Sequence, residues 1–430
     1  MAEPARGRPA PARTTAADRP AADQPVPRPG DEPTLAAAVE RLARLVRLES
    51  PSGDVALLAE LRDVLAGRLA ELGGTVELVP GDAGDHVRAA FPAAGLAPAA
   101  GRPPARAPAP AAGRVPAGGP APAGGHILVV GHYDTVWEAG WLASHPFAVH
   151  GLIATGPGVL DMKGAIVALE LAFELLRDSG RALAQPVQVV LVADEEVSSP
   201  HGRTAVMGAA AGAAAVVGLE PPHPDGGLKT GRRGVARVRL EVHGREAHAA
   251  LAVAGGVSAI DELLDQLVRL RDGLPRAADL GWNIGRVSGG TRANVIAGRA
   301  SAEVGLRFAT RQTERAAFTA VRSLTPVRPG ARVSAEILSS RPAWPATPRN
   351  PLAEHVIGLA AGLGERLGAR PAGGAGDTNF TGAAGLPTVD GLGPRGRGAH
   401  SPAESVRVDS ILRRAELLAL LFSTPLPPLT

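Results

Sequence analysis

Cysteine is absent from this chain of 430 residues, and lysine occurs only as Lys163 and Lys229. Without cysteine the chain can form no disulfide scaffold, no thiolate metal site and no cysteine nucleophile. Any metal ion would therefore be held by histidine and carboxylate side chains. The net charge is only +3, and the arginines form no dense basic run, so the composition does not call for nucleic acid or an anionic membrane as a partner.

Long apolar runs are also missing. None approaches the ~18 residues of a membrane-spanning helix, and the first 33 residues lack the apolar segment of a signal peptide, so we expect a cytoplasmic protein without a membrane partner. Residues 1–33 are rich in Ala, Pro and Arg and are predicted to be a disordered tail. Residues 92–125 form a Pro/Ala/Gly-rich tract and are predicted to be a flexible surface insertion.

The remaining sequence is that of a globular protein. Hydrophobic residues make up 45% and charged residues 20% of the chain, enough to bury a sizeable core, and the length favours two or three domains. Continuous apolar runs alternate with helical patterns, as buried parallel strands and their covering helices do. This alternation predicts an α/β domain with a mainly parallel sheet. The predicted helices are 35–48, 55–72, 165–176, 351–367 and 406–421, and the predicted strands are 75–79, 127–130, 187–193, 213–219 and 386–389.

The pattern changes between residues 228 and 342. Apolar residues at every second position from 236 to 242 indicate a strand with one buried face. Helical and strand-like segments then follow in the order β-α-β-β-α-β, which predicts a ferredoxin-like α+β unit. We therefore expect this unit to be inserted into an α/β catalytic domain built from residues 34–227 and 343–430.

Ionisable residues follow the carboxyl ends of the predicted parallel strands. His132 and Asp134 follow one strand, Glu195 and Glu196 a second, and Glu220 a third. Sites in open α/β sheets form outside these strand ends, and histidine nitrogen with carboxylate oxygen suits Zn²⁺, Co²⁺ or Mn²⁺. Each motif alone has an ordinary structural explanation, such as an acidic turn, and only the combination predicts a metal site.

Two further candidates lie elsewhere in the chain. Asp161 stands at the head of a predicted helix, after a Gly-Pro-Gly turn, and could simply cap that helix. His400 lies in a Gly-rich loop after the last predicted strand. With them the chain has enough ligands for two ions.

In their order, these motifs resemble those of the M20 family of metallopeptidases, most closely its glutamate-carboxypeptidase-like branch. The resemblance covers about residues 35–421, and the tract at 92–125 departs from it. The matching segments are Glu-Ser-Pro-Ser-Gly-Asp (49–54), Gly-His-Tyr-Asp-Thr-Val (131–136), Gly-Pro-Gly-Val-Leu-Asp-Met-Lys-Gly (156–164), Asp-Glu-Glu (194–196), Gly-Leu-Glu-Pro (218–221), Gly-Arg-Glu-Ala-His-Ala (244–249), Gly-Gly-Ala-Gly-Asp-Thr-Asn-Phe (373–380) and Gly-Leu-Gly-Pro-Arg-Gly-Arg-Gly-Ala-His-Ser (391–401).

The resemblance implies a two-zinc site, with Co²⁺ or Mn²⁺ as alternatives. His132 and Glu220 would bind one ion, and Glu196 and His400 would bind the other. Asp161 would bridge the two.

The resemblance also implies three catalytic roles. Asp134 would orient the metal-binding histidine through its second ring nitrogen. Glu195 would be the general base that takes a proton from water at the metals. His248 would stabilise the oxyanion in the site of a neighbouring subunit, which implies a homodimer; its ordinary alternative is a histidine on the polar face of a sheet.

Two positions resemble the family's substrate contacts. Arg307 would hold a substrate carboxylate, for which a guanidinium is well shaped, and Asn294 would lie on the substrate side. A solvated strand arginine is the alternative for Arg307. Arg232 and its neighbour Arg233 are expected to form a hinge with solvated charges.

The expected activity is hydrolysis of an amide bond next to a free carboxylate, such as a C-terminal glutamate. The expected substrate is a small peptide or an N-acyl amino acid. One alternative is an N-acyl-amino-acid deacylase of the acetyl or succinyl type. The other is a catalytically silent homologue that keeps the fold and the metal.

Overall fold

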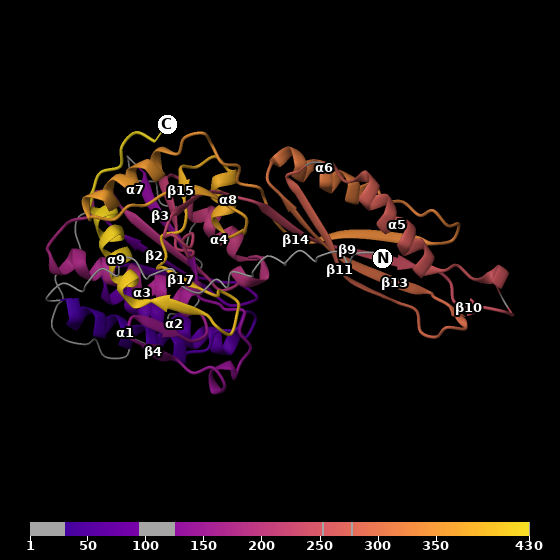
Figure 1. Ribbon diagram of the computed structural model, residues 1–430, viewed down its shortest axis with the longest axis horizontal. Helices are drawn as coiled ribbons and strands as arrows, with labels where there is room; N and C mark the ends of the chain where they lie inside the picture. The colour runs from indigo at the N-terminus through magenta and orange to yellow at the C-terminus, as the bar shows by residue number, and fades with distance from the viewer. Residues whose placement is uncertain (1–30, 94–124, 252, 277, 430) are drawn as a thin grey trace, which may run out of the picture.

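The computed structural model describes residues 31–93, 125–251, 253–276 and 278–429. Residues 1–30 of the predicted tail and 94–124 of the predicted insertion lie outside these ranges. Helix α1 begins at Asp31, so the last three residues assigned to the tail belong to this helix instead. Figure 1 shows two regions, an α/β region that contains both ends of the described chain and an elongated region beside it.

A six-stranded sheet in the order β1-β2-β6-β3-β7-β16 forms the centre of the α/β region. The last four strands of this order pair in parallel, and β1 and β2 extend the sheet with antiparallel pairing. This confirms the predicted α/β class with a mainly parallel sheet. The strands are β1 (Thr75–Val79), β2 (His86–Phe91), β3 (His126–His132), β6 (Val187–Val192), β7 (Ala213–Gly218) and β16 (Thr388–Val389).

Both faces of the central sheet are covered. Ile127 and Val129 of β3 join the core under α1, α2, α3 and α9, whereas Leu128 and Val130 pack toward α4 on the other face. This two-sided burial explains why the central strands are continuous apolar runs in the sequence. The helices of this region are α1 (Asp31–Arg47), α2 (Val55–Glu71), α3 (Gly164–Asp178), α4 (Gly202–Ala209), α7 (Pro351–Gly362), α8 (Thr378–Ala383) and α9 (Val408–Ser423).

The elongated region is a four-stranded antiparallel sheet in the order β11-β13-β9-β14, with two helices on one face. Alternate residues of its two central strands, β9 and β13, are buried, as the period-two pattern predicts. The chain order is the predicted β-α-β-β-α-β. The elements are β9 (Gly234–His243), α5 (Ala259–Gly273), β11 (Leu280–Gly289), β13 (Arg299–Phe308), α6 (Arg311–Arg322) and β14 (Arg332–Arg341), with a short pair β10 (Ala247–His248) and β12 (Val295–Ile296).

Two crossings connect the regions. Strand β8 (Leu228–Arg232) pairs in parallel with β15 (Ala369–Ala372) of the α/β region. The first crossing therefore follows Arg232, slightly later than the expected boundary at 228. At the crossings, Arg232 and Trp344 exchange two backbone hydrogen bonds of 2.8 and 3.1 Å, so the outgoing and returning chains are joined.

A small sheet lies at the edge of the α/β region, in the order β17-β18-β5-β4. Strands β17 (Gly396–Arg397) and β18 (Ser405–Arg407) form a hairpin whose connection contains His400. The other two strands are β4 (Ala148–His150) and β5 (Ile153–Thr155).

Secondary structure departs from the prediction at several places, and two of them concern the central sheet and its covering helices. Strand β2 was not expected, and α7 ends at Gly362 rather than near residue 367. Gly364 adopts a φ of +78°, a conformation that terminates a helix. Among the described residues, no helix combines the length and apolar character needed to cross a bilayer.

Candidate metal and catalytic site

His132 is the last residue of β3, and its side chain is only 1% exposed. Its Nδ1 lies 3.0 Å from the backbone oxygen of Asp134 and 3.4 Å from that residue's carboxylate. Its Nε2 lies 3.2 Å from Asp161 and 3.9 Å from Glu220. One ring nitrogen therefore contacts Asp134, and the other faces the acidic cluster.

The Asp134 carboxylate also holds the turn after β6. It accepts backbone hydrogen bonds of 3.1 Å from both Glu195 and Glu196, and one of 2.6 Å from the hydroxyl of Ser52. Because one carboxylate touches two strand ends, it fixes the histidine and the two glutamates relative to one another.

Asp161 lies between the two histidines. One carboxylate oxygen faces His132, and the other lies 3.4 Å from Nε2 of His400. The same His400 nitrogen is 3.2 Å from Glu196. The two oxygens of Asp161 thus face the two histidines, one each.

Glu404 positions both sides of this arrangement, and sequence reasoning missed it. Its buried carboxylate accepts hydrogen bonds from the backbone of Gly158, Leu160 and Asp161 at 2.9, 2.9 and 3.1 Å. Glu404 lies in the same β17–β18 connection as His400. It therefore ties the loop of the bridging aspartate to the hairpin of the second histidine.

Charge in the site is balanced internally. Burial would lower the pKa of His132, but hydrogen bonds to Asp134 and Asp161 raise it well above its ordinary value. Asp161 and Glu196 raise the pKa of His400 to about 11. Burial raises the pKa of Glu195, Glu196 and Glu220 above the ordinary range. In the metal-free chain, the raised pKa values of the two histidines favour positively charged imidazoles beside the carboxylates. Bound cations would supply the same positive charge.

The donor set fits divalent ions. Ligand atoms of His132, Glu195 and Glu220 lie within 4.8 Å of one another, as do those of His132, Asp161 and Glu196. Oε1 of Glu196 is buried and has no hydrogen-bond partner among the described residues. A buried, unpartnered carboxylate oxygen is costly unless something positive binds it, so this observation agrees with an ion in the cluster.

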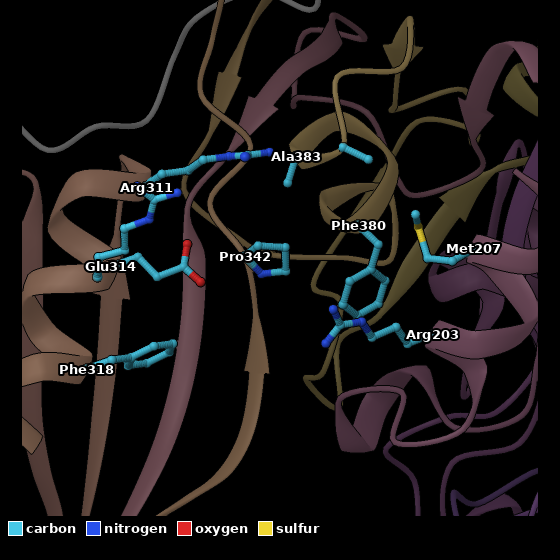
Figure 2. Close-up of a pocket in the computed structure, with 10 residues that line it drawn as sticks. Arg203, Met207, Arg311, Glu314, Phe318, Pro342, Phe380 and Ala383 are labelled. Atoms are coloured by element: carbon cyan, nitrogen blue, oxygen red, sulfur yellow. The ribbon is translucent and has the colours of Figure 1, made fainter. Parts of the chain in front are cut away.

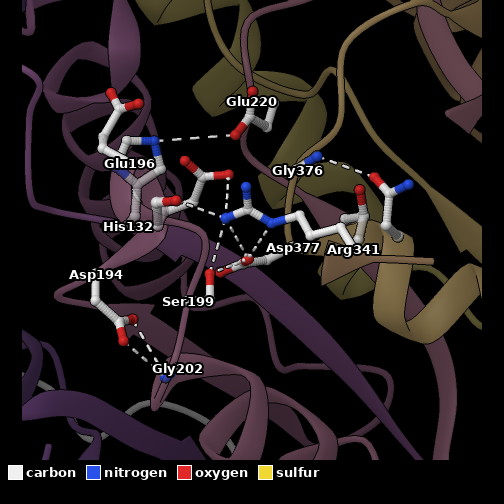
Figure 3. Close-up of polar contacts among 12 residues, drawn as sticks. His132, Asp194, Glu196, Ser199, Gly202, Glu220, Arg341, Gly376 and Asp377 are labelled. Atoms are coloured by element: carbon white, nitrogen blue, oxygen red, sulfur yellow. Dashed lines mark hydrogen bonds and ion pairs between the residues drawn. The ribbon is translucent and has the colours of Figure 1, made fainter. Parts of the chain in front are cut away.

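Glu195 has a cationic partner that sequence reasoning did not find. Nη2 of Arg341, at the end of β14, lies 2.8 Å from Oε1 of Glu195 and 2.6 Å from its backbone oxygen. The same nitrogen contacts Ser199 at 2.8 Å and Asp377 at 3.1 Å (Figure 3). No local motif marks Arg341 in the sequence; only the fold brings it to the turn after β6.

The expectation that Arg232 is a solvated hinge charge is wrong. Its side chain is buried rather than solvated, and lies 3.2 Å from Glu220 and 2.9 Å from Asp390. A buried guanidinium held between two carboxylates is a structural ion pair, and it orients Glu220 toward the cluster.

The three candidates in the antiparallel region are exposed. Asn294 and Arg307 are exposed, and the ring of His248 accepts backbone hydrogen bonds from Ala250 and Leu251. Strand β10, which contains His248, lies at the end of this region farthest from the α/β region (Figure 1). Within one chain the structure therefore brings together the predicted metal ligands, Asp134 and Glu195, but not these three residues.

A separate cavity of about 340 Å³ lies where α4 and α8 face α6 (Figure 2). Arg203 stacks on the ring of Phe380 on one side, and Glu314 approaches from the other. None of the residues of the metal cluster lines this cavity. It is therefore distinct from the candidate site.

The fold and the cluster define a class: an α/β metallohydrolase with carboxylate and imidazole ligands at its strand ends. Residues 128–424 match the family model of peptidase family M20/M25/M40. The match covers more than half of the chain, and the chain belongs to this family of metal-dependent hydrolases.

Individual relatives agree with this assignment. The chain is 30% identical to carboxypeptidase G2 of Pseudomonas sp. (strain RS-16) over 301 residues, 69% of this chain and 72% of that protein. It is 31% identical to succinyl-diaminopimelate desuccinylase of Gluconacetobacter diazotrophicus over 311 residues, 67% of this chain and 78% of that protein. An M20 family metallo-carboxypeptidase from Sulfolobus solfataricus shares the fold with a TM-score of 0.67 at 13% identity, over 90% of this chain and 98% of that one.

Proposed function

We propose that the protein is a two-zinc carboxypeptidase that cleaves an amide bond next to a free carboxylate, with a C-terminal glutamate or a similar residue as leaving group. The observation that supports it most is Asp161, whose two oxygens face the two histidines beside Glu195. The ligands proposed for one ion are His132 and Glu220, and those for the other are Glu196 and His400.

Two cations held there would lower the pKa of a water molecule and polarise the substrate carbonyl. Glu195 accepts the proton of the attacking water and delivers it to the leaving amine. Its raised pKa suits this task because a carboxylate that can hold a proton near neutrality can also pass it on. Asp134 keeps His132 and the backbone of Glu195 in place throughout.

Substrate recognition is assigned to the antiparallel region. Arg307 is exposed on β13 and has no carboxylate within ion-pair distance among the described residues, so its guanidinium is available for the substrate carboxylate. Asn294 would contact the substrate beside it. His248 would reach the site of a second chain in a homodimer, since its own chain holds it far from the cluster (Figure 1).

The similarity to a succinyl-diaminopimelate desuccinylase favours a second candidate, an N-acyl-amino-acid deacylase. Both candidates use the same cluster and differ in what lies on either side of the scissile bond. The similarity to carboxypeptidase G2 supports the carboxypeptidase as the first candidate.

A substrate panel tests the proposal. The metal-loaded protein is assayed with Glu-terminated dipeptides, the same dipeptides with an amidated C-terminus, and N-acetyl and N-succinyl amino acids. We expect the highest kcat/KM for the Glu-terminated dipeptides and a loss of about tenfold or more on amidation, because a charge-assisted contact is removed. Faster hydrolysis of the N-acyl compounds would favour the deacylase, and no turnover of any compound would favour a silent homologue.

A further inference from the structure

A second, arginine-rich cavity lies in the α/β region, with a volume of about 870 Å³. The β17–β18 hairpin, α9 and the segment after α7 form its walls. Six arginines and only two acidic residues line it. The arginines are Arg366, Arg395, Arg397, Arg407, Arg413 and Arg414, and the acids are Glu365 and Asp409.

The positive charge is only partly neutralised by neighbours. Arg407 forms a two-pronged contact with Asp409, at 3.2 and 2.7 Å, and Arg413 pairs with Glu416 at 3.0 Å. In the described part of the chain, Arg366, Arg395 and Arg397 have no carboxylate within 4.0 Å of their guanidinium groups. Since all three are exposed at the cavity, the wall carries a surplus of more than one positive charge.

Arg414 also lines this cavity, and it differs from the other arginines because it is buried. The residue is only 2% exposed. Nε donates to the backbone oxygen of Gly393 at 3.0 Å, and Nη2 donates to that of Gly226 at 2.7 Å. Nη1 has no hydrogen-bond partner among the described residues, and Glu365 stands 3.9 Å away from it.

A buried guanidinium nitrogen without an acceptor is costly. Burial already lowers the pKa of Arg414 to about 10, with Arg395 contributing in the same direction. An anion in the cavity would supply the missing acceptor and offset the repulsion between the two arginines. A guanidinium fork matches the oxygens of phosphate.

We propose that this cavity binds a phosphate-type anion, either inorganic phosphate or a small phosphate monoester, through Arg414 and the exposed arginines around it. The surplus of more than one charge favours a dianion over a single carboxylate. The volume lies within the range of small-molecule sites. This inference does not depend on the proposed peptidase activity.

The position of the cavity gives an anion a direct structural link to the metal cluster. Arg397 and Arg407 lie on the two strands of the hairpin whose connection holds His400 and Glu404. Gly393, which accepts from Arg414, donates its own N–H to the backbone oxygen of Glu220 at 3.0 Å. The cavity therefore borders both the hairpin that holds His400 and the segment that contacts Glu220.

The test is a titration of the metal-loaded protein with inorganic phosphate, at an ionic strength held constant with chloride. The thermal unfolding midpoint of the protein is measured at each phosphate concentration. We expect saturable stabilisation. The variant R366Q/R397Q removes two exposed arginines and should weaken phosphate binding by about tenfold or more. The matched control R181Q/R276Q, which removes two exposed arginines elsewhere, should leave it unchanged.

A second variant is expected to bind phosphate more tightly, which distinguishes a loss of binding from misfolding. Glu365→Gln removes the acid that faces Nη1 of Arg414 and should tighten phosphate binding several-fold, which a folding defect cannot do. Repeating the titration with a phosphate monoester shows whether the cavity prefers free phosphate or a phosphorylated metabolite. Saturable binding of either probe that changes in these variants as expected supports the proposal. Binding that is equal in the wild type, R366Q/R397Q and E365Q, or absent for both probes, would overturn it.

Discussion

The α/β region and the antiparallel region hold their candidate residues in opposite ways. In the α/β region His132, Asp134 and Glu195 are buried and joined by hydrogen bonds, and His400 is the one candidate ligand whose side chain is half exposed. In the antiparallel region His248 and Arg307 are exposed. Groups that must keep a fixed geometry are surrounded by partners, whereas groups that must meet a substrate or a second chain are left open.

The two regions also differ in how their sheets are buried, and this difference explains the two sequence patterns, continuous apolar runs in one region and alternating residues in the other. The central strands are covered on both faces, and the antiparallel strands on one. We expect changes in the metal cluster to abolish chemistry within the same chain. A change at Arg307 should weaken substrate binding, and a change at His248 should abolish the activity of a neighbouring chain.

The largest effect is expected from Asp161→Asn, which weakens the one ligand shared by both ions. Losing the metals removes several kcal/mol of transition-state stabilisation, which lowers the rate about 10⁴-fold or more. Metal content by elemental analysis should fall along with kcat. Asp178→Asn, an exposed change at the end of α3, is the control. Full metal content with normal turnover in the Asp161 variant would refute the bridging role.

Glu195→Gln separates chemistry from metal binding. We expect kcat to fall about 10²–10⁴-fold, since a general base is lost, while metal content stays near that of the wild type. Glu60→Gln, an exposed glutamate on α2, should change neither quantity. If turnover persisted in the Glu195 variant, another group would have to be the base.

Arg307→Gln tests the antiparallel region. Loss of a charge-assisted contact should raise KM for a Glu-terminated dipeptide roughly 10- to 100-fold, with a smaller change in kcat. Arg299 is exposed on the same strand, eight positions away, so Arg299→Gln is a matched control and should have little effect. Equal effects of the two substitutions would mean that Arg307 has no specific role.

Metal affinity should depend on pH. In the metal-free chain, acidic neighbours raise the pKa of His132 and raise that of His400 to about 11. An ion binds neutral imidazole, so each histidine must first release its proton. Affinity should therefore rise with pH, by about tenfold per pH unit for each proton released. Chelator competition at several pH values measures this slope, and a flat profile would contradict it.

The smallest effect is the partial activity expected when two inactive variants are mixed. His248→Ala and Glu195→Gln should each be nearly inactive alone. If His248 serves the site of the neighbouring chain, random exchange of subunits in a symmetric dimer should restore about a quarter of wild-type activity. No recovery after verified exchange would place His248 in its own chain's site or outside catalysis.

Sequence reasoning found most of the site because strand-end residues follow recognisable apolar runs. His132, Glu195 and Glu220 each stand where a buried strand stops, so pattern and topology predict the same place. Arg341 and Glu404 were missed because their partners lie far away in sequence. Arg341 is separated from Glu195 by 146 residues, and no local pattern reports such a contact.

The same reasoning explains the errors in the fold. Strand β2 alternates only partly between buried and half-buried residues, which makes its sequence weaker than the continuous runs of β3 or β6. Residues 232 and 233 look like surface charge, yet Arg232 is buried because two carboxylates from the α/β region surround it.

The most direct test of the metal-dependent mechanism is the metal content of gently purified protein, measured per chain by elemental analysis and paired with hydrolysis of a Glu-terminated dipeptide. We expect two divalent ions per chain, loss of hydrolysis with a chelator and recovery when metal is returned. A chain that binds no metal, or that hydrolyses the dipeptide equally well without it, would contradict the two-metal site.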